Sequence, residues 1–376
     1  MRIVRIATVP FFVLHHLEGQ IRALVAEGHE VHVLTSAGEG FERIAALGVA
    51  GVHATDIPRE ISPLADARAL VQVTALLKQL KPDLVHSNTP KAGLLGAIAA
   101  RLCGVPVRLH TFTGQAWMER RGPVRWLGRL ADRLIVSLNT RCYADSPSQR
   151  DFLVSEGLAA EGKIRVLGAG SLGGVDLMRF DAERLRTAGK EARELLVIPR
   201  HSRVITFIGR VTRDKGIVEL IQAFGQLRDA ALVLVGPLEP ERDPLPAQTL
   251  AEIHRNPAIH AVGYQSRPER YLACADVLCL PSYREGFGIV VIEAAALGVP
   301  CVGTDIVGLR DAVVDGKTGL LVPPRDAAAL ATGLATMLGD DALRLALGTA
   351  ARARVRRDFD AVVVHAHLLR EYASLR

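Results

Sequence analysis

The sequence predicts an α/β protein built from two doubly wound parallel-sheet domains that face each other across a cleft. Short apolar runs alternate with amphipathic runs along the chain, which is typical of βαβ units and of a parallel sheet covered on both faces. The chain has 376 residues, enough for two domains. The alternation is interrupted once, around 168–200, where GAGSLGGVDLMRF precedes a charged helical stretch.

The first half of the chain carries seven apolar runs that we expect to form strands. The first run is followed by HLEGQIRALVAEG, an amphipathic segment whose final glycine is typical of a helix end. The other runs also alternate with helical segments. The predicted strands are 2–8, 30–36, 51–57, 83–88, 105–112, 141–146 and 163–168.

The second half repeats this alternation, and the chain ends in a helical segment that begins near residue 326. We expect an N-terminal domain over 1–172 and a C-terminal domain over 173–355. Residues 356–376 are expected to form a helix that packs back on the N-terminal domain. The predicted strands of the second half are 203–209, 230–236, 259–264, 276–282 and 300–305.

Composition limits the possible partners and compartment. The net charge of +6 favours acidic partners such as phosphates, nucleic acid or an anionic membrane. Aromatic residues make up only 5%, which argues against a base-stacking surface, and we expect no nucleic acid partner. The five cysteines form no CxxC pair and are interpreted as reduced core thiols of a cytoplasmic protein. No uncharged apolar run approaches the roughly 20 residues that span a bilayer.

The segment GRVTRDKG at 209–216 follows a predicted strand and opens a helix. Helix N-termini favour anions, and Arg210 and Lys215 would add two cations there. Arginine can bond a phosphate with two N–H groups at once. The segment therefore predicts a clamp for a diphosphate, with Gly209 at its start. The alternative is a solvated loop with ordinary charges.

The segment REGFGIVVIEAAALGVPC at 284–301 has glycines before a helix and a glutamate on either side of the helix start. Gly286 and Gly288 allow close approach of the backbone to a ligand, and the amides there can hold phosphate oxygens. Glu285 and Glu293 are natural acceptors for sugar or ribose hydroxyls. The alternative is a helix-capping glutamate and a solvent-exposed one, although the apolar neighbours of Glu293 favour burial.

With GYQSRPERY and DGKTGLLVPPRD, these two segments resemble the family-4 retaining glycosyltransferases over essentially the whole chain. The resemblance implies the GT-B fold, with two Rossmann-like domains, and a nucleotide-diphospho-sugar donor, expected to be UDP-linked. Arg210 and Lys215 match diphosphate ligands, Glu293 the ribose ligand, and Glu285 the sugar ligand. The segment Val262–Tyr264 matches the one that reads the base. The amides expected to reach the sugar and phosphates are those of Gly286, Phe287, Gly288 and Ile289.

The resemblance also implies retention of anomeric configuration by front-face attack, with no enzymic nucleophile. The candidate catalytic residues are Glu285, Arg210, Lys215 and His110. No cofactor and no bound metal are expected, because cations and helix amides stabilise the leaving diphosphate.

The first half resembles a subgroup that extends polyprenyl-diphosphate-linked sugars in capsule, O-antigen or glycan assembly. This likeness rests on VPFFVLHHLEGQIRALVAEGHEVHVL, PREISPLAD, HSNTPKAGLLGAIAARLCGVPVRLHTFTGQAW and ADSPSQRDFL. It implies a lipid-linked sugar acceptor and a peripheral position on the cytoplasmic face of the inner membrane. A soluble acceptor is the main alternative. A nucleotide-sugar 2-epimerase and a non-catalytic nucleotide-sugar-binding protein are weaker ones.

Several residues of the first half are candidates for the acceptor side. His110 is either a buried structural histidine or a residue of the site, and His16 either faces the cleft or caps and packs its helix. Lys91 either meets an acceptor phosphate or is solvated. The expected acceptor-binding residues are His16, Lys91, Thr113 and Gln115.

Two further segments need an interpretation. GAGSLG at 168–173 matches the dinucleotide-binding pattern GxGxxG, but the irregular GVDLMRFD that follows argues against a dehydrogenase. Arg125, Arg129 and Arg133 form a basic stripe on a helix that also carries Trp126 and leucines. This stripe is predicted either to dock on anionic lipid or to be a charged solvent face.

Overall fold

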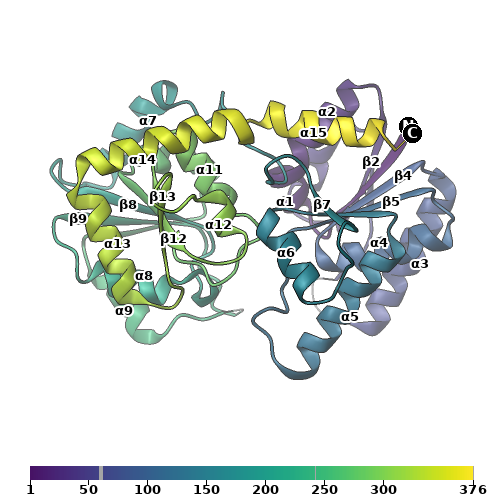
Figure 1. Ribbon diagram of the computed structural model, residues 1–376, viewed down its shortest axis with the longest axis horizontal. Helices are drawn as coiled ribbons and strands as arrows, with labels where there is room; N and C mark the ends of the chain where they lie inside the picture. The colour runs from purple at the N-terminus through teal and green to yellow at the C-terminus, as the bar shows by residue number, and fades with distance from the viewer. Residues whose placement is uncertain (59–61, 242, 376) are drawn as a thin grey trace. The chain divides into compact units, whose positions relative to one another are not determined.

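The computed structural model describes residues 1–58, 62–241 and 243–375 and divides into two compact units (Figure 1). The first unit comprises Met1–Gly173 and Ala361–Arg376, and the second comprises Gly174–Asp360. Within the segment PREISPLAD, residues 59–61 lie outside the described residues.

The second boundary falls after Asp360, five residues later than the sequence predicts. Residues 355–359 form a short π-helix whose last residue, Phe359, is buried. Its carbonyl accepts a hydrogen bond from Val175 N–H at 2.8 Å, and its ring packs on Phe287. These contacts keep the segment in the second unit.

The first unit is built on a seven-stranded parallel sheet with the order β3-β2-β1-β4-β5-β6-β7. The order reverses between β1 and β4, which is where open parallel sheets bind ligands. The strands are β1 (Arg2–Ile6), β2 (Glu30–Thr35), β3 (Gly51–Ala54), β4 (Leu84–Asn88), β5 (Val107–Phe112), β6 (Arg141–Ala144) and β7 (Ile164–Val166).

Helices connect these strands, and five helices of this unit carry a proline in the first turn. The first turn suits proline because its backbone N–H would have no partner there. Ser146 caps α6 by accepting from Gln149 N–H. The helices are α1 (Pro10–Phe12), a π-helix (Val13–Leu17), α2 (Glu18–Ala26), a 3-10 helix (Phe41–Leu47), α3 (Pro63–Leu80), α4 (Pro90–Leu102), α5 (Gly122–Leu138), α6 (Pro147–Ser155) and α15 (Ala361–Ala373).

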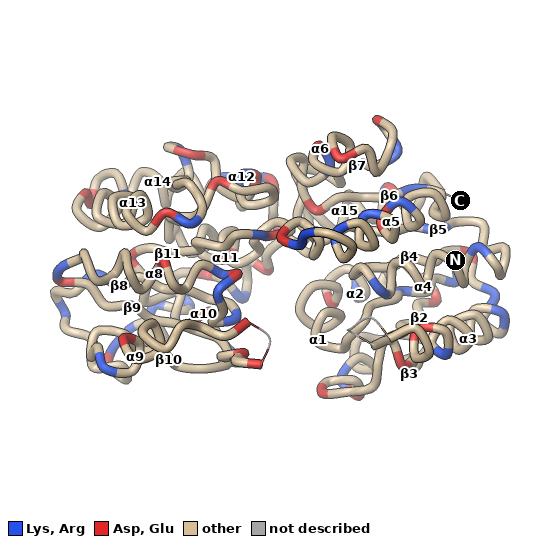
Figure 2. The backbone as a smooth tube through the Cα atoms, turned by 90° about the horizontal axis from the view of Figure 1, so that it is seen from below, with Lys and Arg blue, Asp and Glu red and all other residues tan. Residues whose placement is uncertain are grey.

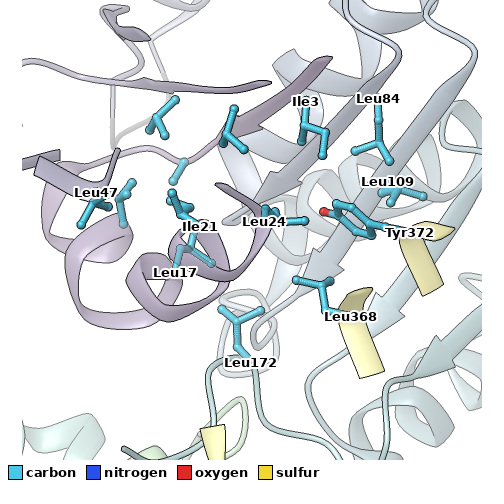
Figure 3. Packing of buried hydrophobic residues seen from close by; sticks show 14 of the residues in the cluster. Ile3, Leu17, Ile21, Leu24, Leu47, Leu84, Leu109, Leu172, Leu368 and Tyr372 are labelled. Atoms are coloured by element: carbon cyan, nitrogen blue, oxygen red, sulfur yellow. The ribbon is translucent and has the colours of Figure 1, made fainter. Parts of the chain in front are cut away.

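The last helix, α15, completes a core of the first unit. Leu368 and Tyr372 point toward residues of β1, β4 and β5 such as Ile3 and Leu109 (Figure 3). The Tyr372 hydroxyl lies 2.5 Å from His86 Nδ1. Burial of these apolar groups binds the end of the chain to the N-terminal sheet.

The second unit has a six-stranded parallel sheet with the order β10-β9-β8-β11-β12-β13. Its order reverses between β8 and β11. The sequence analysis did not predict β13, which lies within DGKTGLLVPPRD. The strands are β8 (Arg203–Ile208), β9 (Ala230–Val235), β10 (Ile259–Gly263), β11 (Val277–Leu280), β12 (Cys301–Thr304) and β13 (Gly319–Val322).

Three helices of the second unit begin after an aspartate whose side chain accepts a backbone N–H of the first turn: Asp181, Asp326 and Asp340. The helices are α7 (Ala182–Leu195), a 3-10 turn (Arg213–Lys215), α8 (Ile217–Phe224), α9 (Ala247–Arg255), α10 (Glu269–Leu272), α11 (Ile289–Ala296), α12 (Leu309–Ala312), α13 (Ala327–Gly339), α14 (Asp341–Arg354) and the π-helix Val355–Phe359.

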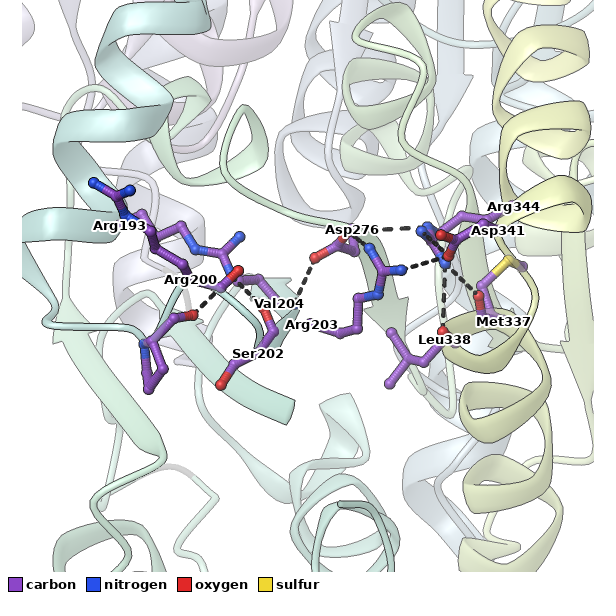
Figure 4. A network of polar contacts seen from close by, with 11 residues as sticks. Arg193, Arg200, Ser202, Arg203, Val204, Asp276, Met337, Leu338, Asp341 and Arg344 are labelled. Atoms are coloured by element: carbon purple, nitrogen blue, oxygen red, sulfur yellow. Dashed lines mark hydrogen bonds and ion pairs between the residues drawn. The ribbon is translucent and has the colours of Figure 1, made fainter. Parts of the chain in front are cut away.

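A polar network ties the amino-terminal end of β8 to α14 (Figure 4). Asp276 accepts from the Val204 N–H at 2.8 Å and from Arg203 Nη1 at 3.3 Å. Asp341 accepts from Arg203 Nη2 and Arg344 Nη2. The network lies at the opposite end of the strands from the predicted donor motifs, so its role is to hold the sheet to its covering helix.

All five cysteines are free thiols, as the sequence predicts, and four of them are buried. Burial raises the pKa of Cys142 to about 12 and that of Cys274 to about 11, and it also raises the pKa of Cys103, Cys279 and Cys301. Among the described residues, none of the helices combines the length and the apolar character that crossing a bilayer requires.

Candidate donor and acceptor sites

Two loops of the second unit meet where its strand order reverses, because β8 and β11 are neighbours and each is followed by a predicted motif. Tyr283 N–H donates to Asp214 carbonyl oxygen at 2.9 Å, joining the loops. Gly216 has φ +71°, and a Cβ at this position would lie 2.0 Å from Pro281 carbonyl oxygen. Only glycine therefore allows this approach.

Lys215 and Glu285 come from these two loops and form an ion pair, with Nζ to Oε1 at 2.6 Å. Ser282 Oγ donates to the same Oε1 at 2.7 Å. Both charged side chains are largely buried. The structure thus brings together two residues that the sequence predicts to bind the donor.

Arg210 lies on the same loop as Lys215 and is held by two carboxylates. Its Nη2 lies 2.9 Å from Asp214 Oδ2, and its Nη1 lies 3.2 Å from Glu239 Oε2. Burial lowers the pKa of Arg210, but the two carboxylates outweigh this effect and the net shift is upward. Gly209 uses its own N–H within the sheet, donating to Val235 carbonyl oxygen at 2.9 Å.

The start of α11 presents backbone amides beside Glu285. Gly288 precedes the helix with φ +85°. Gly308 supports this turn: its φ is +87°, and a Cβ there would lie 2.4 Å from Gly286 carbonyl oxygen. Within the described residues, nothing accepts a hydrogen bond from the four predicted donor-binding amides. They are the amides of Gly286, Phe287, Gly288 and Ile289.

Glu293 lies on the second turn of α11 in a setting that favours its neutral form. Burial raises its pKa to about 7; Arg179 lowers it and Glu269 raises it. Arg179 itself pairs with Glu269, with Nη2 to Oε2 at 2.9 Å. At neutral pH, a carboxyl with this pKa is divided between its neutral and ionised forms. Hydroxyl donors stabilise the ionised form, because they hydrogen-bond to the carboxylate oxygens.

The segment predicted to read the base ends strand β10. Tyr264 is exposed, and Gln265 Nε2 donates to Val262 carbonyl oxygen at 2.7 Å. Gly263 carbonyl oxygen accepts from Gly236 N–H at 2.8 Å. The backbone carbonyls of Val262 and Gly263 therefore both accept hydrogen bonds from the protein itself.

Residues predicted for the acceptor follow β1, β4 and β5, which are neighbours in the first sheet. His16 lies in the π-helix after β1, half-buried, and burial with the neighbouring His15 lowers its pKa to about 4. Lys91 lies in the first turn of α4 and pairs with Asp66, with Nζ to Oδ1 at 2.8 Å. The Lys91 side chain is therefore paired with a carboxylate rather than simply solvated.

His110 lies inside the sheet on β5 and is buried. Its Nδ1 lies 3.0 Å from Ser87 Oγ, and burial lowers its pKa to about 3. This placement favours the structural interpretation of His110 over a catalytic one. Thr113 is half-buried just after β5, whereas Gln115 is buried and its Oε1 accepts from Gln149 Nε2 at 3.3 Å.

Sequence reasoning missed the acidic partners of the donor motifs. Glu239 and Asp243 lie in the loop after β9, and Asp243 Oδ2 accepts from Asp214 N–H at 2.7 Å. Their position after a parallel strand was the only available signal. Lys and Arg segments and Asp and Glu segments are interspersed over both units (Figure 2). In the described part of the chain, no three His, Cys, Asp or Glu side chains are arranged to hold a metal.

Helix α5 differs from the basic stripe that the sequence suggests. Arg125 and Arg129 both pair with Glu156, the residue that follows α6, at 3.2 and 3.0 Å, and lie over the ring of Trp117. The opposite side of the helix is apolar and exposed. Its exposed residues are Val124 at 51%, Trp126 at 63%, Leu127 at 45%, Leu130 at 39% and Leu134 at 40%.

Both halves of the chain match known protein families. Residues 190–354 match the glycosyl transferases group 1, and residues 14–170 match the glycosyl transferase 4-like domain. The capsular polysaccharide biosynthesis glycosyltransferase CapM of Staphylococcus aureus is 31% identical over 352 residues, which is 93% of this chain and 90% of CapM. The UDP-Gal:alpha-D-GlcNAc-diphosphoundecaprenol alpha-1,3-galactosyltransferase of Escherichia coli is 28% identical, over 76% of this chain and 74% of the relative.

Other relatives differ in the acceptor that their names give. They include a glycogen synthase of Mycobacterium tuberculosis at 30% identity and a D-inositol 3-phosphate glycosyltransferase of Corynebacterium efficiens at 31%. Among solved structures, Anabaena Alr3699/HepE in complex with UDP superposes with a TM-score of 0.81 at 20% identity, covering 100% of both chains.

Two parallel-sheet α/β units with these relatives define a sugar-transferring enzyme of the GT-B fold class. The chain belongs to the group 1 glycosyltransferases, and its N-terminal half is of the glycosyl transferase 4-like type.

Proposed function

We propose that the protein transfers a sugar from a UDP-sugar to a polyprenyl-diphosphate-linked sugar during cell-surface polysaccharide synthesis. The observation that carries this proposal is the cluster of Arg210, Lys215 and Glu285 beside the α11 amides. Cations and amides suit a diphosphate, and a carboxylate suits sugar hydroxyls. The UDP complex of the structural neighbour and the printed names of the relatives support the choice of donor.

The second unit, 173–355 in the sequence-based division, is proposed to bind the donor. Arg210, Lys215 and the amides of 286–289 would hold the diphosphate, Glu285 the sugar hydroxyls, and Glu293 the ribose diol. The acceptor oxygen forms a bond to the anomeric carbon, while the bond between the anomeric carbon and the β-phosphate oxygen breaks. The electron pair and the acceptor proton both pass to that phosphate oxygen, so that UDP leaves. Charge on the leaving diphosphate is met by Lys215 and Arg210, and we expect no bound metal or cofactor.

The first unit, 1–172, is proposed to bind the acceptor through residues that follow β1, β4 and β5. His16, Lys91, Thr113 and Gln115 remain the candidates. The names of CapM and of the galactosyltransferase favour a lipid-linked acceptor. The D-inositol 3-phosphate glycosyltransferases favour the second candidate, a small soluble acceptor.

A lipid-linked acceptor would require contact with the inner face of the membrane, and α5 is the surface that we propose for it. An exposed apolar helix side bordered by arginines is typical of an interfacial helix. Arg133 is exposed beside Leu130 and Leu134. Because Arg125 and Arg129 are engaged by Glu156, the leucines rather than the arginine stripe would enter the lipid.

The transfer is tested by measuring UDP release from a panel of UDP-sugars with three acceptors. These are a polyprenyl-diphosphate-linked N-acetylglucosamine, inositol phosphate, and none. UDP release that depends on the lipid-linked acceptor is expected, and it should persist in EDTA. Dependence on inositol phosphate would favour the soluble alternative. Conversion of the UDP-sugar to an epimer without acceptor would contradict transferase function.

A further inference from the structure

In the anion-binding loops of the second unit, the two cations that are predicted to bind the diphosphate are already paired with three carboxylates. Arg210 is shared by Asp214 and Glu239, and Lys215 is paired with Glu285. A site that only had to attract a diphosphate would gain from an excess of positive charge. Donor binding alone therefore does not explain why two carboxylates pair with Arg210.

Asp214 and Glu239 hold Arg210 in different ways. Asp214 lies in the 3-10 turn that follows Arg210 on the same loop. Its Oδ1 accepts from Thr212 Oγ1 at 2.5 Å, and its N–H donates to Asp243 Oδ2. Asp214 is thus a fixed part of the loop that orients the guanidinium. Glu239 reaches Arg210 from the separate loop after β9, and it covers Nη1, a donor that a phosphate oxygen could also use.

We propose that Glu239 is a specificity residue that speeds release of the nucleoside diphosphate product by repelling its extra negative charge. This inference rests on the proposed function. The diphosphate of a UDP-sugar has no terminal phosphate. Bond cleavage creates one, and its second ionisation, with a pKa near 6, makes UDP more negative than the donor at neutral pH.

A carboxylate beside Arg210 therefore disfavours UDP more than it disfavours the UDP-sugar. Glu239 also offers Arg210 a replacement partner once UDP has left, because the ion pair can re-form. Removing the charge of Glu239 should tighten binding of UDP about threefold to fivefold, the range of a half-exposed charge interaction. Binding of the UDP-sugar should change less.

The test compares Glu239→Gln with Glu241→Gln in the full-length protein. Glu241 is exposed on the same loop, so its variant controls for loss of one charge nearby. Calorimetric titration without acceptor measures the Kd of UDP and of the UDP-sugar for each protein. Glu239→Gln is expected to lower the Kd of UDP, to shift the ratio of the two Kd values toward UDP, and to strengthen product inhibition. Glu239→Asp keeps the charge and should restore the ratio.

Three outcomes would overturn the proposal. They are weaker UDP binding by Glu239→Gln, an equal change in both Kd values, or the same shift in Glu241→Gln. Failure of the proposed function looks different, because the unsubstituted protein would then bind neither UDP nor any UDP-sugar.

Discussion

The ring of Phe287 packs on the ring of Phe359, with centroids 5.2 Å apart and planes at 60°. Phe287 belongs to the predicted donor loop, and its side chain is buried while its backbone amide lies at the start of α11. Phe359 is the penultimate residue of the second unit. The aromatic contact therefore holds the donor loop in place through its buried side chain. Gly308 packs closely against the same loop at Gly286.

Gly308→Ala should disturb the donor loop more than an ordinary glycine substitution. The new Cβ would meet Gly286 carbonyl oxygen at 2.4 Å, and the backbone must keep φ +87°. We expect a loss of about 2 kcal/mol in stability and weaker UDP binding. Gly316→Ala is the matched control, because φ is +65° there and no atom lies within 4 Å of the added Cβ. Equal melting temperatures and UDP affinities for the two variants would refute the supporting role.

Lys215→Met should lower kcat/KM for sugar transfer by about 100-fold or more, because a cation near the leaving diphosphate acts mainly on the transition state. Steady-state kinetics with the panel of UDP-sugars provides the measurement. Lys190→Met, an exposed substitution on α7, should leave the rate unchanged. Full activity of Lys215→Met would remove Lys215 from the catalytic candidates.

Binding of a UDP-sugar should strengthen as pH rises through about 7, the pKa to which burial raises Glu293. Only the ionised carboxyl can accept from both hydroxyls of a diol, so affinity should be lost as pH falls. Between about pH 6 and pH 8 the expected gain is about tenfold. Titrations should use the UDP-sugar rather than UDP, whose terminal phosphate ionises in the same range. Glu293→Gln should flatten the profile, and a profile that keeps its slope would contradict this assignment.

Asp145→Asn should stabilise the first unit at neutral and basic pH. Burial raises the pKa of Asp145 to about 7, and its Oδ1 has no partner among the described residues. A folded pKa above the unfolded one means that the folded carboxyl resists ionisation. Stability attributable to Asp145 is therefore complete below about pH 4 and is lost as pH rises toward 7. The amide of the introduced asparagine could also donate into the cavity of about 20 Å³ that Gln20 lines.

Thermal melts of Asp145→Asn at about pH 4.5, 6 and 8 check this sign. The melting temperature should exceed that of the unsubstituted protein by an amount that grows with pH and then levels off above about 7. Asp151→Asn, on an exposed neighbour, is the control. A gain that is the same at every pH would show that ionisation is not the cause.

Replacing Leu127 and Leu134 of α5 with Asp should reduce binding to phosphatidylglycerol vesicles by at least about tenfold, because two leucines lose their apolar burial in lipid. Co-sedimentation provides the measurement. Leu64→Asp with Val71→Asp is the matched control, since both residues are exposed on α3, at 77% and 68%. Equal effects of the two double variants would argue against α5. If the α5 variant instead abolished self-association in gel filtration, a second copy of the chain would be the partner.

The fold followed from the sequence where apolar runs were distinct. Each strand of the first sheet overlaps a predicted run, and so do β8 to β12 of the second. β13 was missed because Gly319–Val322 is a four-residue edge strand enclosed by a glycine and two prolines. The structure divides the chain after Asp360 rather than after residue 355, and the contact of Phe359 with Phe287, a partner far away in the sequence, accounts for the difference.

The site could be predicted only in part. Arg210, Lys215 and Glu285 could be proposed as donor ligands because they follow neighbouring parallel strands. The pairing of Arg210 with Glu239 was not found, because no motif marks that loop. Alternation along β5 could not separate a buried His110 from an exposed one, since the sheet is covered on both faces. On α5, the arginines looked exposed because the sequence does not show that Glu156 lies beside them.

Burial raises the pKa of all five native thiols, which lowers the thiolate fraction of each below that of an exposed cysteine. Thiolates are the species that react with maleimides. The native cysteines should therefore react slowly with a maleimide-linked fluorophore. A single cysteine introduced at an exposed position such as Gly316 could be labelled selectively, without first replacing the native ones.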